Sequence, residues 1–201
     1  MRRFIAILAV LGAGIGPALA YDAASQAIID RFKPGKRLPL AELATLMLGA
    51  ERWCYNQQDG ECAWSDIYLW ADESGAGYEL SNPWSEAVDI SLVDRGVFRD
   101  DRYFCEAGFD WIASVRAYSR EDGLAIEGRD LHRLREDIAA MMQIEGANDC
   151  FDYLYSGHDA EAQTITLLQR QFVDGVHQAT EDAQVTLHFD KHTADNLGWY
   201  Q

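Results

Sequence analysis

The sequence predicts an α+β protein in which an antiparallel β meander, folded as a sheet or a partial barrel, is packed by helices. Two observations support this prediction. Segments that alternate apolar and polar residues fill the middle of the chain, separated by polar turn clusters too short for parallel crossovers. Apolar residues with helical spacing occur near the N-terminus and at residues 130–145.

The beginning of the chain has the pattern of a cleaved export signal. Two arginines precede an apolar stretch at residues 4–16, which is too short to span a bilayer. Ala18 and Ala20 supply the small residues that a signal peptidase requires, so we expect residues 1–20 to be removed; an uncleaved N-terminal anchor is the alternative. Residues 21–201 are then expected to form a single globular domain in the periplasm or outside the cell.

The elements follow in a definite order. Helical spacing at residues 23–33 ends at Pro34-Gly35, and a second helix is expected at residues 39–48, with Pro39 at its first position. Alternation then predicts strands at residues 64–70, 88–92 and 109–116, with turns at 72–75, 94–96, 106–108 and 121–123. A third helix is expected from Asp130, its N-cap, to Gly146. Strands resume at residues 151–155, 164–168 and 185–189, although 164–172 could instead be helical.

Four cysteines in an exported chain predict two disulfides. Three pairings are possible. We favour Cys54–Cys62, which brackets a turn signal, together with Cys105–Cys150. A four-cysteine zinc site is the alternative, but the chain lacks C-x-x-C spacing and such a site needs reduced thiols.

The charge balance restricts the class of partner. The chain has 33 acidic residues against 17 basic ones, a formal net charge of −16, which disfavours nucleic acid and anionic membranes and favours a cationic partner. The acidic stretch at residues 51–94 is a candidate surface for a cationic protein, although a merely solvated face explains it too. After the leader no apolar run is long enough for a membrane helix, and we expect no membrane insertion.

An aromatic stripe is the candidate ligand site. On a strand, Trp64, Asp66, Tyr68 and Trp70 share one face, and a flat aromatic face beside a carboxylate can stack on a sugar ring or surround a cation. The alternative is that this face belongs to the core. Asp66 fits the core poorly, since a buried charge needs a partner.

The C-terminal histidines are the candidate metal ligands. On a strand, His188, Asp190 and His192 share a face, but about 13 Å separates the two histidines, too far for one ion. Only neighbours such as His188 and Asp190 could share a metal, and we favour a solvated polar face on an edge strand. No cofactor is predicted.

Two further clusters combine reactive residue types. Ser156, His158 and Asp159 are close in sequence, but Ser156-Gly157 is more typical of a turn than of a catalytic site. The arginines at 129, 133 and 135 alternate with acidic residues and are expected to pair within their helix.

The chain has no G-x-S-x-G, H-E-x-x-H or EF-hand motif. The sequence therefore favours a soluble, exported, non-catalytic binding or accessory module with a small-molecule or protein ligand. The alternative is a periplasmic hydrolase with a site built from carboxylates and histidine, and a third possibility is a structural protein that binds only other proteins.

Overall fold

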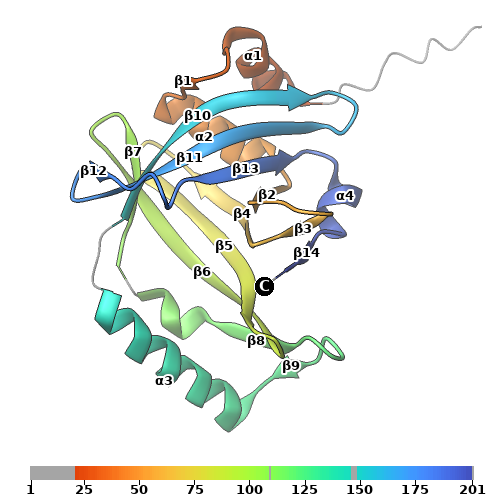
Figure 1. The fold of residues 1–201 in the computed structure, drawn as a ribbon, viewed down its shortest axis with the longest axis vertical. Coiled ribbons are helices and arrows are strands. Elements are labelled where there is room, and N and C mark those ends of the chain that lie inside the picture. The colour runs from red at the N-terminus through yellow and green to blue at the C-terminus, as the bar shows by residue number, and fades with distance from the viewer. Residues whose placement is uncertain (1–20, 109, 146–148, 201) are drawn as a thin grey trace, which may run out of the picture.

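The computed structural model describes residues 21–108, 110–145 and 149–200 of the chain. The predicted export signal at residues 1–20 lies outside the described residues. In the described part, a mainly antiparallel β-sheet is accompanied by four α-helices, which confirms the predicted α+β class (Figure 1). None of the helices described there has the length and apolar character needed to cross a bilayer.

The helices are α1 (Ala23–Arg31), α2 (Leu40–Gly49), α3 (Gly128–Glu145) and α4 (Lys191–Asp195), with a 3-10 helix η1 (Asp110–Ser114). The long strands are β2 (Arg52–Tyr55), β4 (Trp64–Ala71), β5 (Gly75–Ser85), β6 (Val88–Arg99), β7 (Tyr103–Glu106), β10 (Asp149–Asp159), β11 (Thr164–Val173) and β13 (Ala183–His188). The short strands are β1 (Lys36–Arg37), β3 (Glu61–Cys62), β8 (Arg116–Ser119), β9 (Ala125–Ile126), β12 (Val176–His177) and β14 (Gly198–Trp199).

The long strands form a closed ring, so the predicted sheet or partial barrel is a closed barrel. Hydrogen-bonded antiparallel pairs follow the order β10, β11, β13, β2, β4, β5, β6 and β7. The ring closes because β7 pairs with β6 on one side and with β10 on the other. In Figure 1, β7 lies beside β10 although more than forty residues separate them in the sequence.

Both predicted disulfides are present, and one of them lies at the point of closure. Cys105 on β7 is the direct cross-strand partner of Cys150 on β10, and the two form a disulfide. The second bond joins Cys54 on β2 to Cys62 on β3. Among the described residues no free cysteine remains.

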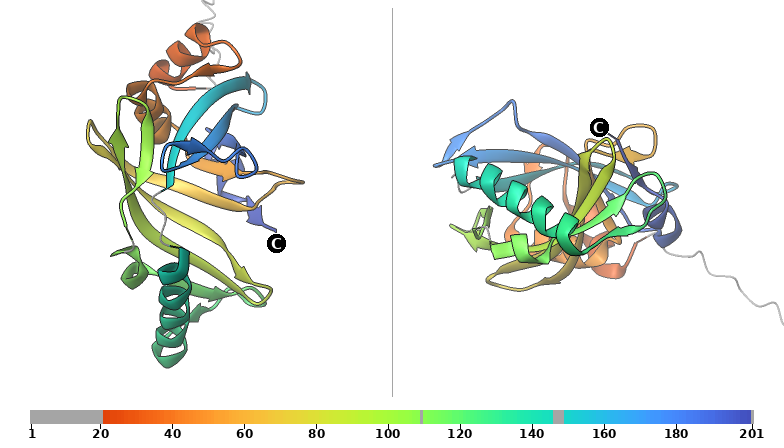
Figure 2. Two further views of the ribbon diagram at one scale, coloured as in Figure 1. Left: turned by 60° about the vertical axis from the view of Figure 1, so that its left-hand side comes forward. Right: turned by 90° about the horizontal axis from the view of Figure 1, so that it is seen from below.

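The first two helices cover one end of the barrel. Leu43, Leu46 and Met47 of α2 are buried in one cluster with Trp53 and with side chains from β10, β11 and β13. Helix α2 begins after Pro39, which occupies the N-cap and not the first helical position. Figure 2 (left) shows α1 and α2 at the opposite end of the molecule from α3.

A second, smaller core lies below the barrel, where β5 and β6 extend beyond it. Ile90, Val115 and Ile138 are buried there among residues of β6, β8 and α3. The strand predicted at residues 109–116 is wrong, because residues 110–114 form η1 and only β8 is extended. The Ser114 hydroxyl explains the difference: it donates to the Trp111 carbonyl and accepts from the Val93 amide, which holds a tight turn against the edge of β6.

Three other local predictions change. The turn expected at residues 94–96 is continuous strand in β6, paired with β5. The turn expected at Ser156-Gly157 is a bulge inside β10. Helix α3 begins at Gly128 and not after Asp130, and its predicted end at Gly146 lies outside the described residues. The segment left open between strand and helix, residues 164–172, is strand β11.

Candidate functional site

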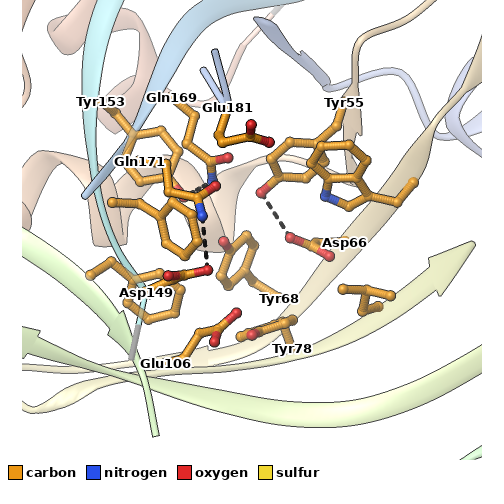
Figure 3. A pocket seen from close by; sticks show the side chains of 14 residues that line it. Tyr55, Asp66, Tyr68, Tyr78, Glu106, Asp149, Tyr153, Gln169, Gln171 and Glu181 are labelled. Carbon is orange, nitrogen blue, oxygen red and sulfur yellow. Dashed lines mark hydrogen bonds between the residues drawn. The ribbon is translucent and has the colours of Figure 1, made fainter. Parts of the chain in front are cut away.

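The barrel encloses a cavity of about 220 Å³ at the end remote from α1 and α2. Its wall is built from β2, β4, β5, β7, β10 and β11 and from the segment just before β13 (Figure 3). The lining residues are Tyr55, Trp64, Asp66, Tyr68, Tyr78, Leu80, Phe104, Glu106, Asp149, Phe151, Tyr153, Gln169, Gln171 and Glu181. Seven of these are aromatic, four are acidic and two are amides, and no Lys, Arg or His is among the described lining residues.

An aromatic layer separates the cavity from the helix-covered core. Trp53 is fully buried and makes edge-to-face contacts with Tyr68 at 5.0 Å and Tyr153 at 5.8 Å between ring centroids. Both tyrosines line the cavity on their other side. Because these rings are tightly packed, the cavity has a rigid apolar floor and its polar groups lie along the wall and the mouth.

Three of the four residues of the predicted aromatic stripe line the cavity. Trp64, Asp66 and Tyr68 alternate inward along β4 as expected. Trp70 does not, because β4 contains a bulge between Tyr68 and Trp70. The extra residue turns the Trp70 ring outward over Gly77, where it is 43% exposed. The prediction that all four residues share a face is therefore wrong at Trp70.

Asp66 is the central polar residue of the wall. Its side chain is only 5% exposed. The Tyr55 hydroxyl donates a 2.8 Å hydrogen bond to its Oδ2, while its buried Oδ1 has no hydrogen-bond partner. Burial raises the pKa of Asp66 to about 7, since the charged form loses its hydration; the Tyr55 hydrogen bond opposes this rise and the charge of Asp94 adds to it.

The tyrosines of the wall are neutral donors at physiological pH. Burial raises the pKa values of Tyr55, Tyr68 and Tyr78 well above the usual value, and that of Tyr153 in the same direction. The Tyr55 ring also stacks on Trp64, with 4.7 Å between centroids and 14° between planes. Asp66 thus lies beside a flat aromatic surface.

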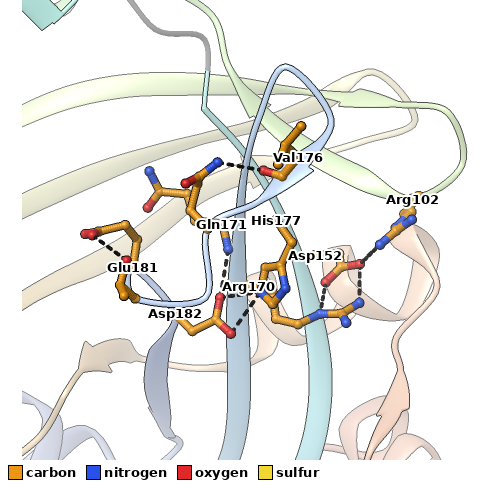
Figure 4. Close-up of polar contacts among 10 residues, drawn as sticks. Arg102, Asp152, Arg170, Gln171, Val176, His177, Glu181 and Asp182 are labelled. Atoms are coloured by element: carbon orange, nitrogen blue, oxygen red, sulfur yellow. Dashed lines mark hydrogen bonds and ion pairs between the residues drawn. The ribbon is translucent and has the colours of Figure 1, made fainter.

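The mouth of the cavity carries the remaining carboxylates. Gln171 Nε2 donates a 2.8 Å hydrogen bond to Asp149, as the dashed line in Figure 3 shows. Glu181 lies on the connection between β12 and β13. This connection is held in place by a contact of 2.8 Å between His177 Nε2 and Asp182 (Figure 4). The rim is therefore acidic on more than one side.

A cluster of ion pairs on the outer side of the barrel wall joins Asp152 to Arg102 and Arg170. Asp152 on β10 is fully buried and accepts two hydrogen bonds of 2.7 Å from Arg170 on β11 and one of 2.9 Å from Arg102 (Figure 4). Its charge is fully partnered, in contrast to that of Asp66. This pairing makes Asp152 a structural residue of the barrel.

The predicted metal ligands do not converge. Strand β13 ends at His188, whose Nε2 lies 3.0 Å from Gln57 Oε1. Asp190 is the N-cap of α4 and accepts a 2.8 Å hydrogen bond from the Thr193 amide, and His192 lies on that helix. The prediction that these three residues form a solvated face on an edge strand is wrong, because β13 pairs with both β11 and β2, His188 is buried, and Asp190 and His192 lie beyond the strand. Among the described residues, no group of three or more His, Cys, Asp and Glu side chains is placed to hold a metal ion.

The other predicted clusters have local roles. His158 Nδ1 lies 2.8 Å from the Tyr155 hydroxyl, and Asp159 accepts from the amides of the following turn. Arg133 pairs with Asp130 within α3, at 3.9 Å, as expected. Arg135 instead donates twice to the Val115 carbonyl, which ties α3 to η1 and β8.

Sequence reasoning missed most of the cavity lining. Phe104, Glu106, Asp149, Gln169 and Glu181 come from segments that are far apart in the sequence. Only the closure of the ring brings them together, so no local motif marks them; alternation along β10 and β11 is the one signal that could have placed some of them inward. Comparison with protein-family models, curated proteins and solved structures gave no match.

Proposed function

We propose that this protein is an exported, non-catalytic binding module that holds a small organic ligand in the cavity of its barrel. The cavity itself carries the proposal: it combines a rigid aromatic floor with a few polar groups, which is the usual composition of a ligand site. Its volume of about 220 Å³ is below the roughly 300–1,000 Å³ of typical ligand pockets, which restricts the ligand to a small molecule.

The predicted leader and the two disulfides support the location. A disulfide that joins β7 to β10 persists in an oxidising compartment such as the periplasm or the cell exterior. The disulfide also supports the binding role, because it fixes the pairing of β7 with β10 beside Phe104 and Phe151, which both line the cavity. A preformed site loses less entropy when it binds.

Ligand-observed NMR with a set of small organic fragments tests the proposal. The mature protein is compared with Leu80→Trp, which fills the cavity from β5, and with Val93→Trp, which adds the same ring on the exposed outside of β6. We expect saturation transfer to several fragments in the parent and in Val93→Trp, and its loss in Leu80→Trp.

Two outcomes contradict the proposal. Fragments that bind Leu80→Trp as well as the parent occupy another surface. A full fragment set that never binds the parent shows that the cavity does not admit ligands. Circular dichroism of Leu80→Trp checks that the variant is folded before either conclusion is drawn.

A further inference from the structure

We propose that the ligand is a small primary ammonium compound whose charged nitrogen binds between the aromatic wall and the Asp66 carboxylate. The inference rests on the proposed binding function and names the chemical class of its ligand. Three independent features of the cavity lead to it.

The first feature is the sign of the charge. Asp66, Glu106, Asp149 and Glu181 contribute carboxyl groups, and no basic side chain is among the described residues that line the cavity. Glu181 extends this charge to the exposed mouth, where an approaching cation meets it first. Acidic walls around a partly apolar cavity concentrate cations and repel anions.

The second feature is the unsatisfied oxygen of Asp66. Oδ2 has its donor in Tyr55, but Oδ1 is buried without one. A buried acceptor without a partner is costly, and an ammonium N–H supplies both the missing donor and the compensating charge. A neutral alcohol supplies only the donor, and an anion supplies neither.

The third feature is the group of aromatic side chains beside Asp66. Tyr55, Tyr68 and Tyr78 lie around Asp66 on the wall in Figure 3. Trp64, another lining residue, stacks on the Tyr55 ring. The faces of aromatic rings attract cations, most strongly where water is excluded. The four acidic lining residues come from β4, β7, β10 and the segment before β13, and no group of three or more His, Cys, Asp and Glu side chains among the described residues is placed to hold a metal ion.

The test uses three probes with one carbon chain: n-butylammonium, n-butanol and butyrate. We expect n-butylammonium to bind the mature protein at pH 8 with a Kd about tenfold lower than that of n-butanol, and butyrate not to bind. Asp66→Asn should reduce the preference for the cation to about threefold or less. Asp89→Asn removes a carboxylate from the outer side of β6, beside Arg120, and should leave the preference unchanged.

The pH dependence of the parent protein gives a second measurement that needs no variant. Asp66 faces Tyr55 on β2, Tyr78 on β5 and Tyr153 on β10, and it interacts with the charge of Asp94 on β6. Glu106 on β7, Asp149 on β10 and Glu181 before β13 are the other carboxyl groups of the cavity lining. The tyrosines stay neutral, and burial raises the pKa of Asp66 to about 7 and that of Asp94 to about 6, so both groups ionise between pH 5.5 and 8. Affinity for n-butylammonium should rise across this range, whereas affinity for n-butanol should not.

The outcomes separate this inference from the proposed function. If n-butanol or butyrate binds as well as n-butylammonium, or if Asp66→Asn keeps the full preference, the cavity binds ligands but the inference is wrong. The inference is also wrong if other fragments bind and n-butylammonium does not. If neither the fragment set nor any of the three probes binds the parent, the proposed function itself fails.

Discussion

Asp66 and Asp152 show how differently two buried aspartates can be used in one barrel. Asp152 is held by two arginines on the outer side of the wall, so its charge contributes to the structure. Asp66 has one tyrosine donor and one oxygen without a partner on the inner side. The sequence marked Asp66 as poorly suited to a core, because the alternation of β4 turns it inward. It gave no such indication for Asp152, whose arginine partners lie 18 and 50 residues away.

The raised pKa of Asp66 predicts a pH-dependent stability. In the folded protein the Asp66 carboxyl group keeps its proton up to about pH 7, whereas in the unfolded chain it loses the proton near pH 3.9. The free energy of unfolding therefore decreases as pH rises between these values. Asp66→Asn removes this titration. In urea unfolding, the variant should match the parent near pH 4 and exceed it at pH 8 by roughly 2–4 kcal/mol. Asp137→Asn removes a charge from the exposed side of α3 and serves as the control. The prediction is contradicted if Asp66→Asn and the parent differ in stability by the same amount at pH 4 and at pH 8.

At the scale of the element, strand β4 shows what alternation predicts and where it stops. The period of two correctly placed Trp64, Asp66 and Tyr68 on one face, since a regular strand turns alternate side chains the same way. A single bulge reversed that order at Trp70. Alternation was equally misleading at residues 109–116, where side-chain hydrogen bonds of Ser114 favour a tight turn. Neither a bulge nor hydrogen bonds of this kind leave a periodic signal in the sequence.

Gly96 on β6 and Gly77 on β5 should differ in how well they tolerate substitution by alanine. A Cβ on Gly96 would overlap the ring of Phe104, which is buried and lines the cavity, and would also press on the Cys105 carbonyl. A Cβ on Gly77 would overlap only the half-exposed Trp70 ring, which can move outward. Gly96→Ala should therefore lower the free energy of unfolding by about 1–3 kcal/mol, and Gly77→Ala by less than about 1 kcal/mol. Urea unfolding of both variants checks this, and equal losses would show that Phe104 is free to move.

At the scale of the molecule, one short strand decides the architecture. Strand β7 closes the ring, and the Cys105–Cys150 disulfide holds it there. The helices α1 and α2 cover one end, and the cavity occupies the other. The extension of β5 and β6 carries a second core with α3, and none of the described side chains of α3 lines the cavity.

The two disulfides should therefore differ in their effect on the molecule. Cys105 and Cys150 close a loop with a sequence separation of 45, whereas Cys54 and Cys62 have a separation of 8. Chain entropy predicts a loss of about 4 kcal/mol for the double serine variant of the first pair and about 2.5 kcal/mol for that of the second. Hydrogen exchange adds a structural readout: removal of the first pair should speed exchange in β7 and the start of β10, and removal of the second should leave those strands protected. Faster exchange in those strands after removal of the second pair alone would contradict this.

The sequence by itself determined the α+β class and the helical and stranded segments with strong periodicity, because periodicity is a local property of a chain. It favoured one of three cysteine pairings, and the structure settled which of them forms. Only the tertiary structure decided that the sheet closes, that β13 ends at His188 and gives way to α4, and that a cavity exists with Asp66 on its wall. Closure depends on hydrogen bonds between β7 and β10, and the cavity depends on side chains from six strands and a loop. Contacts at such sequence separations arise from the packing of the whole chain and have no counterpart in any short segment.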